Sequence, residues 1–146
     1  MTFIYEEDKS LILNAPRIYV SYSGGADSTY ALLRIKEYLD SIELTSKLIA
    51  LHFNHENKQS SAFESHCRDF CNERNITFES QNIKVEVSGE GFEAAARHKR
   101  MNVLKSLPEN SLVIQGHHSD DQIETILFRI IRGTGLKGMS GIPRLT

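Results

Sequence analysis

An apolar run that ends at a pair of glycines constrains the fold of this 146-residue chain more than any other stretch. Residues 18–22 read Ile-Tyr-Val-Ser-Tyr, residues 23–28 read Ser-Gly-Gly-Ala-Asp-Ser, and an amphipathic segment follows. That order is typical of a buried strand, a tight loop and a helix whose first backbone N–H groups can surround an anion. The sequence therefore predicts a phosphate-binding loop at the start of a helix.

Strand-like and helix-like patterns alternate along the rest of the chain. The strand-like runs cover residues 17–22, 47–53, 76–83 and 112–114, and helical spacing of apolar residues covers residues 27–39, 61–75 and 92–107. A last helix is predicted to start near Ser119, in a segment with the form of a capping box, and to end at Arg132. This alternation predicts one α/β domain with a parallel twisted sheet and helices on both faces.

The composition of the chain limits the classes of function that it can have. Charged residues make up 25% and hydrophobic ones 40%, and no window approaches the roughly 20 apolar residues of a membrane span. Residues 1–8 end in acidic side chains and lack the basic start of a signal peptide, so we expect a cytoplasmic protein without a membrane partner. With a net charge of −2, binding a polynucleotide would require local basic groups or a further domain.

The two cysteines, Cys67 and Cys71, lie four residues apart on a predicted helix, and Phe63 and Phe70 fall on the same stripe. Two residues on one regular helix face rarely reach disulfide geometry, and the sequence offers no second pair of metal ligands. We therefore interpret both as core cysteines, with a two-cysteine metal half-site as the alternative.

The loop after the first strand has the composition of a phosphate site. Gly24 and Gly25 permit a close approach that side chains would block, and the Ser23 and Ser28 hydroxyls can bond phosphate oxygens. Asp27 would repel a phosphate unless a cation lies between them, which indicates a bound Mg²⁺. Alternatively, Asp27 is only an acidic residue that is favourable in the first helical turn. The alternative for the whole loop is a tight turn that binds no ligand. The loop lacks the Walker lysine, which disfavours transfer of a γ-phosphate.

Two further polar clusters, at residues 52–55 and 117–124, also follow predicted strands. Because the carboxyl ends of parallel strands meet at one edge, we expect one site there. We interpret the first cluster as a loop that contacts a nucleotide, and His117 as a phosphate contact or proton carrier. Asp121 and Glu124 share one face of the predicted helix and could hold an ammonium group or a metal ion; capping and the helix dipole are the alternative.

Two basic elements are further candidates for phosphate contacts. Arg97 follows three alanines that allow close packing, so its guanidinium could clamp a phosphate; a solvated surface arginine is the alternative. Residues 132–138 form a glycine-rich basic loop that could close over phosphates or a polynucleotide backbone, with a helix stop and a flexible tail as the alternative.

Together these elements resemble the PP-loop ATP pyrophosphatase superfamily, of which the Ser-Gly-Gly-x-Asp-Ser loop is typical. Four further elements resemble one family within it, the tRNA(Ile)-lysidine synthetases. They are Phe-Asn-His at 53–55, Glu-Ala-Ala-Ala-Arg at 93–97, Gly-His-His-Ser-Asp-Asp-Gln-Ile-Glu-Thr at 116–125 and Arg-Gly-Thr-Gly-Leu-Lys-Gly-Met at 132–139. The similarity extends over about residues 17–143.

The resemblance implies a reaction and its reagents. The family's catalytic domain uses ATP and Mg²⁺ to adenylate the C2 oxygen of cytidine 34 in the anticodon of tRNA(Ile), and free L-lysine then displaces AMP to give lysidine. Adenylation splits one difficult substitution into two easier ones. The implied protein is a ligase whose partners are the tRNA(Ile) anticodon loop and L-lysine. The resemblance leaves open whether its oligomeric state is a homodimer.

The resemblance also implies roles for residues. The implied ATP-binding residues are Ser23, Gly24, Gly25, Ala26, Asp27, Ser28, His52, Phe53 and Asn54. Asp27 would also lie near Mg²⁺ and, with Arg97 and His117, assist the phosphate chemistry. Asp121 and Glu124 would bind the ammonium group of lysine, and the loop of Arg132, Gly133, Thr134 and Gly135 would lie near AMP or the tRNA.

Two features depart from the family pattern. Residues 56–59 lack the Gly-Leu that commonly follows the family's histidine. The chain ends at Thr146, where the family's catalytic domain continues toward C-terminal tRNA-binding domains, so we expect residues 1–146 to be the first part of that catalytic domain. The alternatives are a nucleotide-binding module without turnover and a related PP-loop tRNA-modifying enzyme. A tRNA thiolase is disfavoured, because Cys67 and Cys71 are not reactive cysteines in separate motifs.

Overall fold

The computed structural model describes residues 6–84, 91–118 and 124–130. In chain order its elements are α1 (Glu6–Asn14), β1 (Ile18–Ser21), α2 (Ala26–Ser41), the short 3-10 helix η1 (Thr45–Lys47), β2 (Leu48–Asn54), α3 (Ser60–Glu73), β3 (Thr77–Asn82), α4 (Phe92–Lys105), β4 (Leu112–His118) and β5 (Glu124–Ile130). The sequence patterns do not predict α1. No helix within the described ranges is long and apolar enough to cross a membrane.

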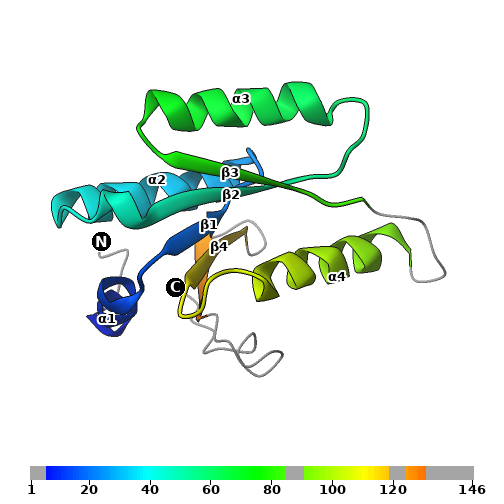
Figure 1. Cartoon of the computed structure of the whole chain (residues 1–146). Coiled ribbons are helices and arrows are strands. Elements are labelled where there is room, and N and C mark those ends of the chain that lie inside the picture. Colours follow the sequence, from blue (N-terminus) through cyan, green and yellow to red (C-terminus); the bar gives the residue numbers. More distant parts are fainter. Residues whose placement is uncertain (1–5, 85–90, 119–123, 131–146) are drawn as a thin grey trace.

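β1 lies at the centre of the sheet that the described residues form, which has the strand order β3-β2-β1-β4-β5. The strands β1 to β4 run parallel, and Val20 lies opposite Ala50 of β2 and Ile114 of β4. β5 runs antiparallel to β4 at the edge. The predicted α/β fold with a parallel sheet is confirmed, and β5 adds one antiparallel strand to it (Figure 1).

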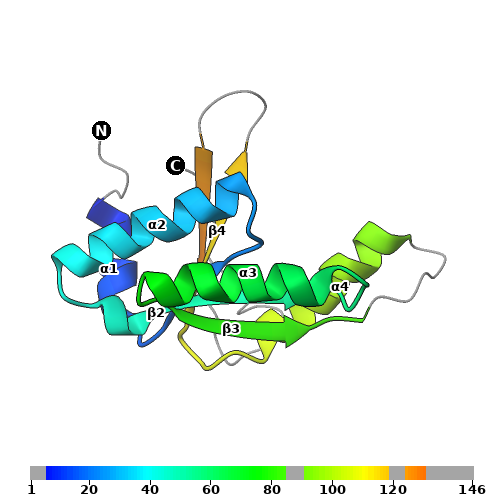
Figure 2. The same cartoon turned by 90° about the horizontal axis from the view of Figure 1, so that it is seen from above.

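Helices cover both faces of the sheet, as predicted. Alternate residues of a strand point to opposite faces, so Ile18 and Val20 join one core and Tyr19 joins the other. The first core takes buried side chains from α1, α2 and α3: Ile12, Ala31, Leu32, Ile35, Leu39, Cys67 and Cys71. The second core takes Leu104 from α4. Figure 1 shows α3 and α4 on opposite sides of the sheet, and Figure 2 shows α2 and α3 side by side.

The prediction of core cysteines is confirmed. Cys67 and Cys71 are free thiols with no exposed surface. Burial raises the pKa of both, that of Cys71 to about 11, so the thiols stay neutral at physiological pH. Within the described residues no group of three His, Cys, Asp or Glu side chains could hold a metal ion, so the metal half-site gains no support.

The prediction of a helix that starts at Ser119 is wrong for those residues of the segment that the structure describes. Residues 124–130 form β5, with Phe128 opposite Ile114 of β4, while residues 119–123 and 131–146 lie outside the described ranges. The run Glu-Thr-Ile-Leu-Phe-Arg-Ile is rich in β-branched and aromatic residues, which favour strands, and the edge of β4 offers backbone groups for pairing. Because Glu124 starts a strand, the helix face predicted for it and Asp121 is wrong as well.

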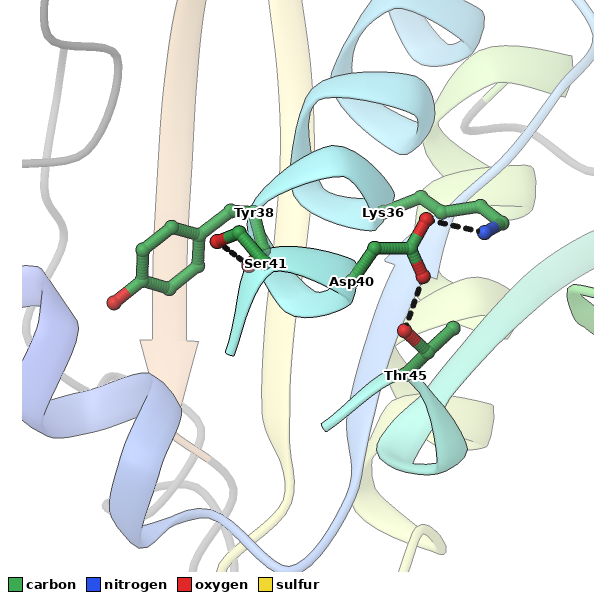
Figure 3. A network of polar contacts seen from close by, with 5 residues as sticks. All are labelled: Lys36, Tyr38, Asp40, Ser41 and Thr45. Carbon is green, nitrogen blue, oxygen red and sulfur yellow. Dashed lines mark hydrogen bonds and ion pairs between the residues drawn. The ribbon is translucent and has the colours of Figure 1, made fainter. Parts of the chain in front are cut away.

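Asp40 ties the end of α2 to the turn that leads into β2 (Figure 3). Its carboxylate accepts hydrogen bonds from Lys36 Nζ at 2.6 Å and from the Thr45 hydroxyl, and these two partners lower its pKa. The Ser41 hydroxyl donates to the Tyr38 carbonyl oxygen at 2.6 Å, which satisfies one of the last carbonyl groups of the helix. These contacts fix the path along which the chain leaves α2 and enters the strand beside β1.

The glycine loop packs directly on α3. Gly24 has a φ of +88°, a conformation that residues with a Cβ atom rarely adopt. A Cβ atom at Gly24 would lie 2.8 Å from Cζ of Phe63 and 2.9 Å from Sγ of Cys67. Glycine at this position therefore allows the loop to lie close to α3, and α3 in turn sets the position of the loop.

Glu64 ties α3 to the end of β2 and to the middle of β3. Its Oε1 accepts hydrogen bonds from Asn54 Nδ2 at 2.9 Å and from the Ser80 hydroxyl, and its Oε2 lies 3.3 Å from Nη2 of Arg68. The hydrogen bonds from Ser80 and Asn54 stabilise the charged carboxylate and lower its pKa. One side chain thus anchors α3 over two strands.

Replacing Gly24 by alanine should destabilise the chain and push the loop off α3. The added Cβ atom meets an unfavourable φ and two close atoms, so we expect a loss of about 2 kcal/mol in the free energy of unfolding. Gly25→Ala is the matched control, because Gly25 has an extended backbone and its Cβ atom would come no closer than 3.4 Å to Ser23 Oγ. Urea unfolding compares the variants, and equal stabilities would contradict the close packing.

Replacing Glu64 by glutamine should lower the free energy of unfolding near neutral pH. At acidic pH the same replacement should lower it much less. A carboxylate whose pKa is lowered on folding contributes stability that is present above its ordinary value of 4.5 and is lost as the pH falls through the lowered value. We expect the free energy of unfolding of the variant to be about 1 kcal/mol below that of the unmodified chain at about pH 7, and this difference to become smaller toward about pH 3. Thermal unfolding across this range measures it.

The control is Glu73→Gln, which removes the same charge at the exposed end of α3. It should change stability by a few tenths of a kcal/mol. A Glu64→Gln deficit that stayed constant with pH would show that the charge of Glu64 does not anchor the helix.

Candidate functional site

A pocket of about 660 Å³ opens at the carboxyl ends of β1 and β2. The two strand ends, the first turns of α3 and one residue of α4 line it, through Ser21, Tyr22, Ser23, His52, Phe53, Asn54, His55, Asn57, Gln59, Ser60, Ala62, Phe63, His66 and Arg100. Ligand sites of open parallel sheets lie at this edge, and the volume suits a small molecule. Two of the three clusters expected at one site, the glycine loop through Ser23 and the polar cluster at 52–55, therefore meet there.

The two serine hydroxyls of the loop hold each other. Ser23 Oγ lies 3.0 Å from Ser28 Oγ, and each oxygen also accepts a backbone N–H, that of Gly25 at 3.2 Å and that of Ser23 at 3.0 Å. α2 begins at Ala26, directly behind the loop, and its N-cap is Gly25, which has no side chain to cap it. The hydroxyls and the first N–H groups of α2 together form a cradle of donors that suits an oxyanion.

Asp27 stands half-buried in the first turn of α2. A carboxylate is favourable there because of the helix dipole, and one carboxylate together with phosphate oxygens is a common ligand set of Mg²⁺. The described residues contain no cluster that could hold a metal through protein ligands alone. A cation at Asp27 would therefore share its coordination shell with oxygens of a bound nucleotide, and the donor set fits Mg²⁺ in that form.

His52 holds the ends of β1 and β2 together. It is buried, its Nδ1–H donates to the Tyr22 carbonyl oxygen at 3.0 Å, and its ring stacks on Phe78 with the centroids 5.8 Å apart. The Phe63 ring lies 6.1 Å away on the pocket side. His52 thus forms part of a fixed, largely aromatic wall.

Asn54 shapes the turn that follows β2. Its Nδ2 donates to Glu64, and its Oδ1 accepts the N–H of Glu56 at 2.7 Å. The next residue, His55, is half-buried and lines the pocket beside Phe92, with ring centroids 6.0 Å apart. The pocket wall on this side therefore joins residues of β2 to the start of α4.

Arg100 lines the pocket but the sequence analysis did not single it out. It follows Ala96 by four residues and precedes Leu104 by four, and both are buried, so Arg100 lies on the inward stripe of α4. Arg97, the predicted clamp, is exposed and does not line the pocket. Arginine is rarely found on a buried stripe without a reason, and this spacing is the signal that identifies it. Among the described lining residues, Arg100 is the one with a permanent charge.

Two of the other predicted residues, His117 and Glu124, lie in strands. His117 is in β4, opposite Thr125, and because β4 is parallel to β1 its backbone lies at the same edge of the sheet as the pocket. Glu124 is the first residue of β5. Asp121 and the loop residues Arg132, Gly133, Thr134 and Gly135 lie outside the described ranges. Their roles stay predictions.

Known proteins resemble nearly the whole chain. The PP-loop domain family matches residues 3–146. The tRNA(Ile)-lysidine synthase of Francisella tularensis subsp. tularensis (strain SCHU S4 / Schu 4) is 39% identical over 145 residues, which cover 92% of this chain and 35% of that protein. The proteins of that name from Pseudomonas putida and Coxiella burnetii are 40% and 36% identical, covering 90% and 85% of this chain and 31% and 28% of their own lengths.

This chain thus spans about a third of the length of the curated relatives it matches. The matched part contains the glycine loop, both strands that end at the pocket, and α4. The parallel sheet, the loop at the start of α2 and the family match agree with one another. The chain belongs to the PP-loop domain family.

Proposed function

We propose that this chain provides the ATP-binding and adenylating site of a tRNA(Ile)-lysidine synthase, a ligase that converts ATP to AMP and pyrophosphate. The observation that carries the proposal is the pocket of about 660 Å³ beside a glycine loop at a helix start. Such a pocket suits a base and ribose, and the loop suits phosphates. The names of the relatives support the choice of reaction, and we assign it to the cytoplasm.

In the proposed complex the base and ribose of ATP occupy the pocket along residues 52–54, and the phosphates lie over the loop at residues 23–28. The Ser23 and Ser28 hydroxyls exchange their mutual contact of 3.0 Å for bonds to phosphate oxygens. Arg100 is close enough to the ligand space to add a permanent positive charge. Asp27 would hold Mg²⁺, and the cation would screen charge between this carboxylate and the phosphates.

Two substitutions make up the proposed reaction. The C2 oxygen of cytidine 34 attacks the α-phosphorus, a new P–O bond forms, and the bond to pyrophosphate breaks. The amine of L-lysine then attacks C2, the C2–O bond to AMP breaks, and the amine loses one proton. We assign Arg97 to stabilising phosphate charge and His117 to moving a proton, both from the family resemblance.

The lysine and RNA contacts are further parts of the proposal. Asp121 and Glu124 carry the negative charge that an ammonium group needs, although β5 removes the argument from a shared helix face. The loop of Arg132, Gly133, Thr134 and Gly135 is assigned to AMP or the tRNA(Ile) anticodon loop. The second candidate function, a nucleotide-binding module without turnover, is compatible with a chain that spans about a third of its relatives.

The test is release of AMP by this chain with ATP, Mg²⁺ and a tRNA(Ile) anticodon stem-loop, with and without L-lysine. The proposal expects AMP release that depends on both the RNA and lysine, because AMP leaves only when the amine attacks. Binding of ATP without any AMP release would favour the nucleotide-binding module. AMP release without lysine dependence would favour another PP-loop tRNA-modifying enzyme.

Arg100→Gln should weaken ATP binding about tenfold, because one charge-assisted hydrogen bond to a phosphate contributes about 1.5 kcal/mol. Lys105→Gln is the matched control, since it removes the same charge from the same helix at a residue that does not line the pocket. Titration calorimetry with Mg·ATP measures both affinities. If Arg100→Gln binds ATP as tightly as Lys105→Gln, Arg100 does not contact the nucleotide.

A further inference from the structure

The helix α4 carries an exposed aromatic residue at its start and an exposed cation two turns later. Phe92, the first residue of the helix, is 47% exposed. Lys99 is exposed as well. We call these two residues the α4 surface. Figure 2 shows that the first turns of α4 are not covered by the other described helices.

The cations of α4 differ from those of the other long helices. On α2, Arg34 and Lys36 each pair with a carboxylate, and on α3 Arg68 pairs with Glu64. None of the ion pairs that the structure describes involves Arg97 or Lys99 of α4. The whole chain has a net charge of −2, so this positive charge is local. Such a patch favours a polyanionic partner.

The ring of Phe92 and the charge of Lys99 are arranged in a way that suits nucleic acid. Lys99 follows Phe92 by seven residues, or two helical turns, so both lie on one side of α4 about 10 Å apart along its axis. An exposed aromatic ring beside cations is the combination that binds a base by stacking and its backbone by charge. A protein partner of acidic character would use the cations but would not need the ring.

Phe92 also connects the α4 surface to the pocket. Its ring lies 6.0 Å from the ring of His55, which lines the pocket. A base stacked on Phe92 would therefore lie at the pocket mouth, next to the proposed ATP site. Duplex RNA buries its bases in the stack, so an unpaired segment is the form that this ring can bind.

We propose that the α4 surface binds single-stranded RNA, with Phe92 stacking on one base and Lys99 contacting the backbone. This inference rests on the proposed function, because it assigns the RNA substrate of that site to a particular face of the chain. It requires the RNA to be unpaired where it meets α4. It also places the RNA on the helix that bears Arg100, so one helix contacts both substrates.

The experiment measures binding of a fluorescent single-stranded RNA, and of the same sequence as a duplex, to the full 146-residue chain by anisotropy at several salt concentrations. The proposal expects the single strand to bind more tightly. Phe92→Ala should weaken its binding about tenfold and Phe92→Trp should retain it, since tryptophan keeps the stacking surface. Lys99→Gln should reduce the slope of log affinity against log salt by about 0.7.

The matched controls lie on α2. Leu33→Ala removes an apolar side chain that is 37% exposed, and Lys36→Gln removes one positive charge, and neither should change RNA binding. Equal binding of single strand and duplex, an unchanged affinity in Phe92→Ala, or no RNA binding at all would overturn the inference. A loss in Phe92→Trp as large as in Phe92→Ala would also overturn it, because stacking would not be the cause.

Mg·ATP binding by the same samples separates this inference from the proposed function. In one outcome the chain binds ATP and releases AMP in a lysine-dependent way, but neither Phe92→Ala nor Lys99→Gln changes the RNA affinity. This outcome would overturn the inference about the α4 surface and leave the proposed function intact. The expected RNA results without any AMP release would overturn the proposed function and support the α4 surface.

Discussion

Gly24 lies against Phe63 and Cys67 at a distance that leaves no room for a Cβ atom, and the site is built outward from this contact. Phe63 touches the loop and also lines the pocket, so the phosphate cradle and the pocket wall share one side chain. Glu64, the next residue, fastens α3 to the end of β2 and to β3. Loop, helix and strand ends therefore keep their relative positions without a ligand, which reduces the ordering cost of binding.

Positive charge is distributed unevenly over the helices that surround this frame. The cations of α2 and α3 are engaged with carboxylates of their own helices, so they contribute little field at the pocket. α4 covers the opposite face of the sheet and directs Arg100 into the pocket and Lys99 outward. A chain with a net charge of −2 can thus offer anions an attractive site, because Arg100 lines the pocket and Arg97 and Lys99 lie on the same helix.

The parts of the fold and site that follow from short-range patterns could be predicted, and those that depend on distant partners could not. The strand, glycine loop and helix at residues 18–41 are encoded locally by apolar spacing and by glycine torsions. The spacing of Leu127 and Ile130 suits a helix, yet the backbone edge of β4 pairs with this run as β5. Arg100 could be identified only once Ala96 and Leu104 had shown which side of α4 is buried.

The proximity of Phe92 to His55 has a consequence for how two substrates could react at this edge of the sheet. In the proposed reaction, the RNA oxygen has to reach the α-phosphorus of ATP bound in the pocket. A base that stacks on Phe92 lies at the mouth, so it is a neighbour of the reacting base rather than the reacting base itself. Drawing one base out of a stack costs a few kcal/mol, and an exposed ring that replaces the lost stacking partner offsets part of this cost. In the proposed complex, the exposure of Phe92 would therefore serve the reaction.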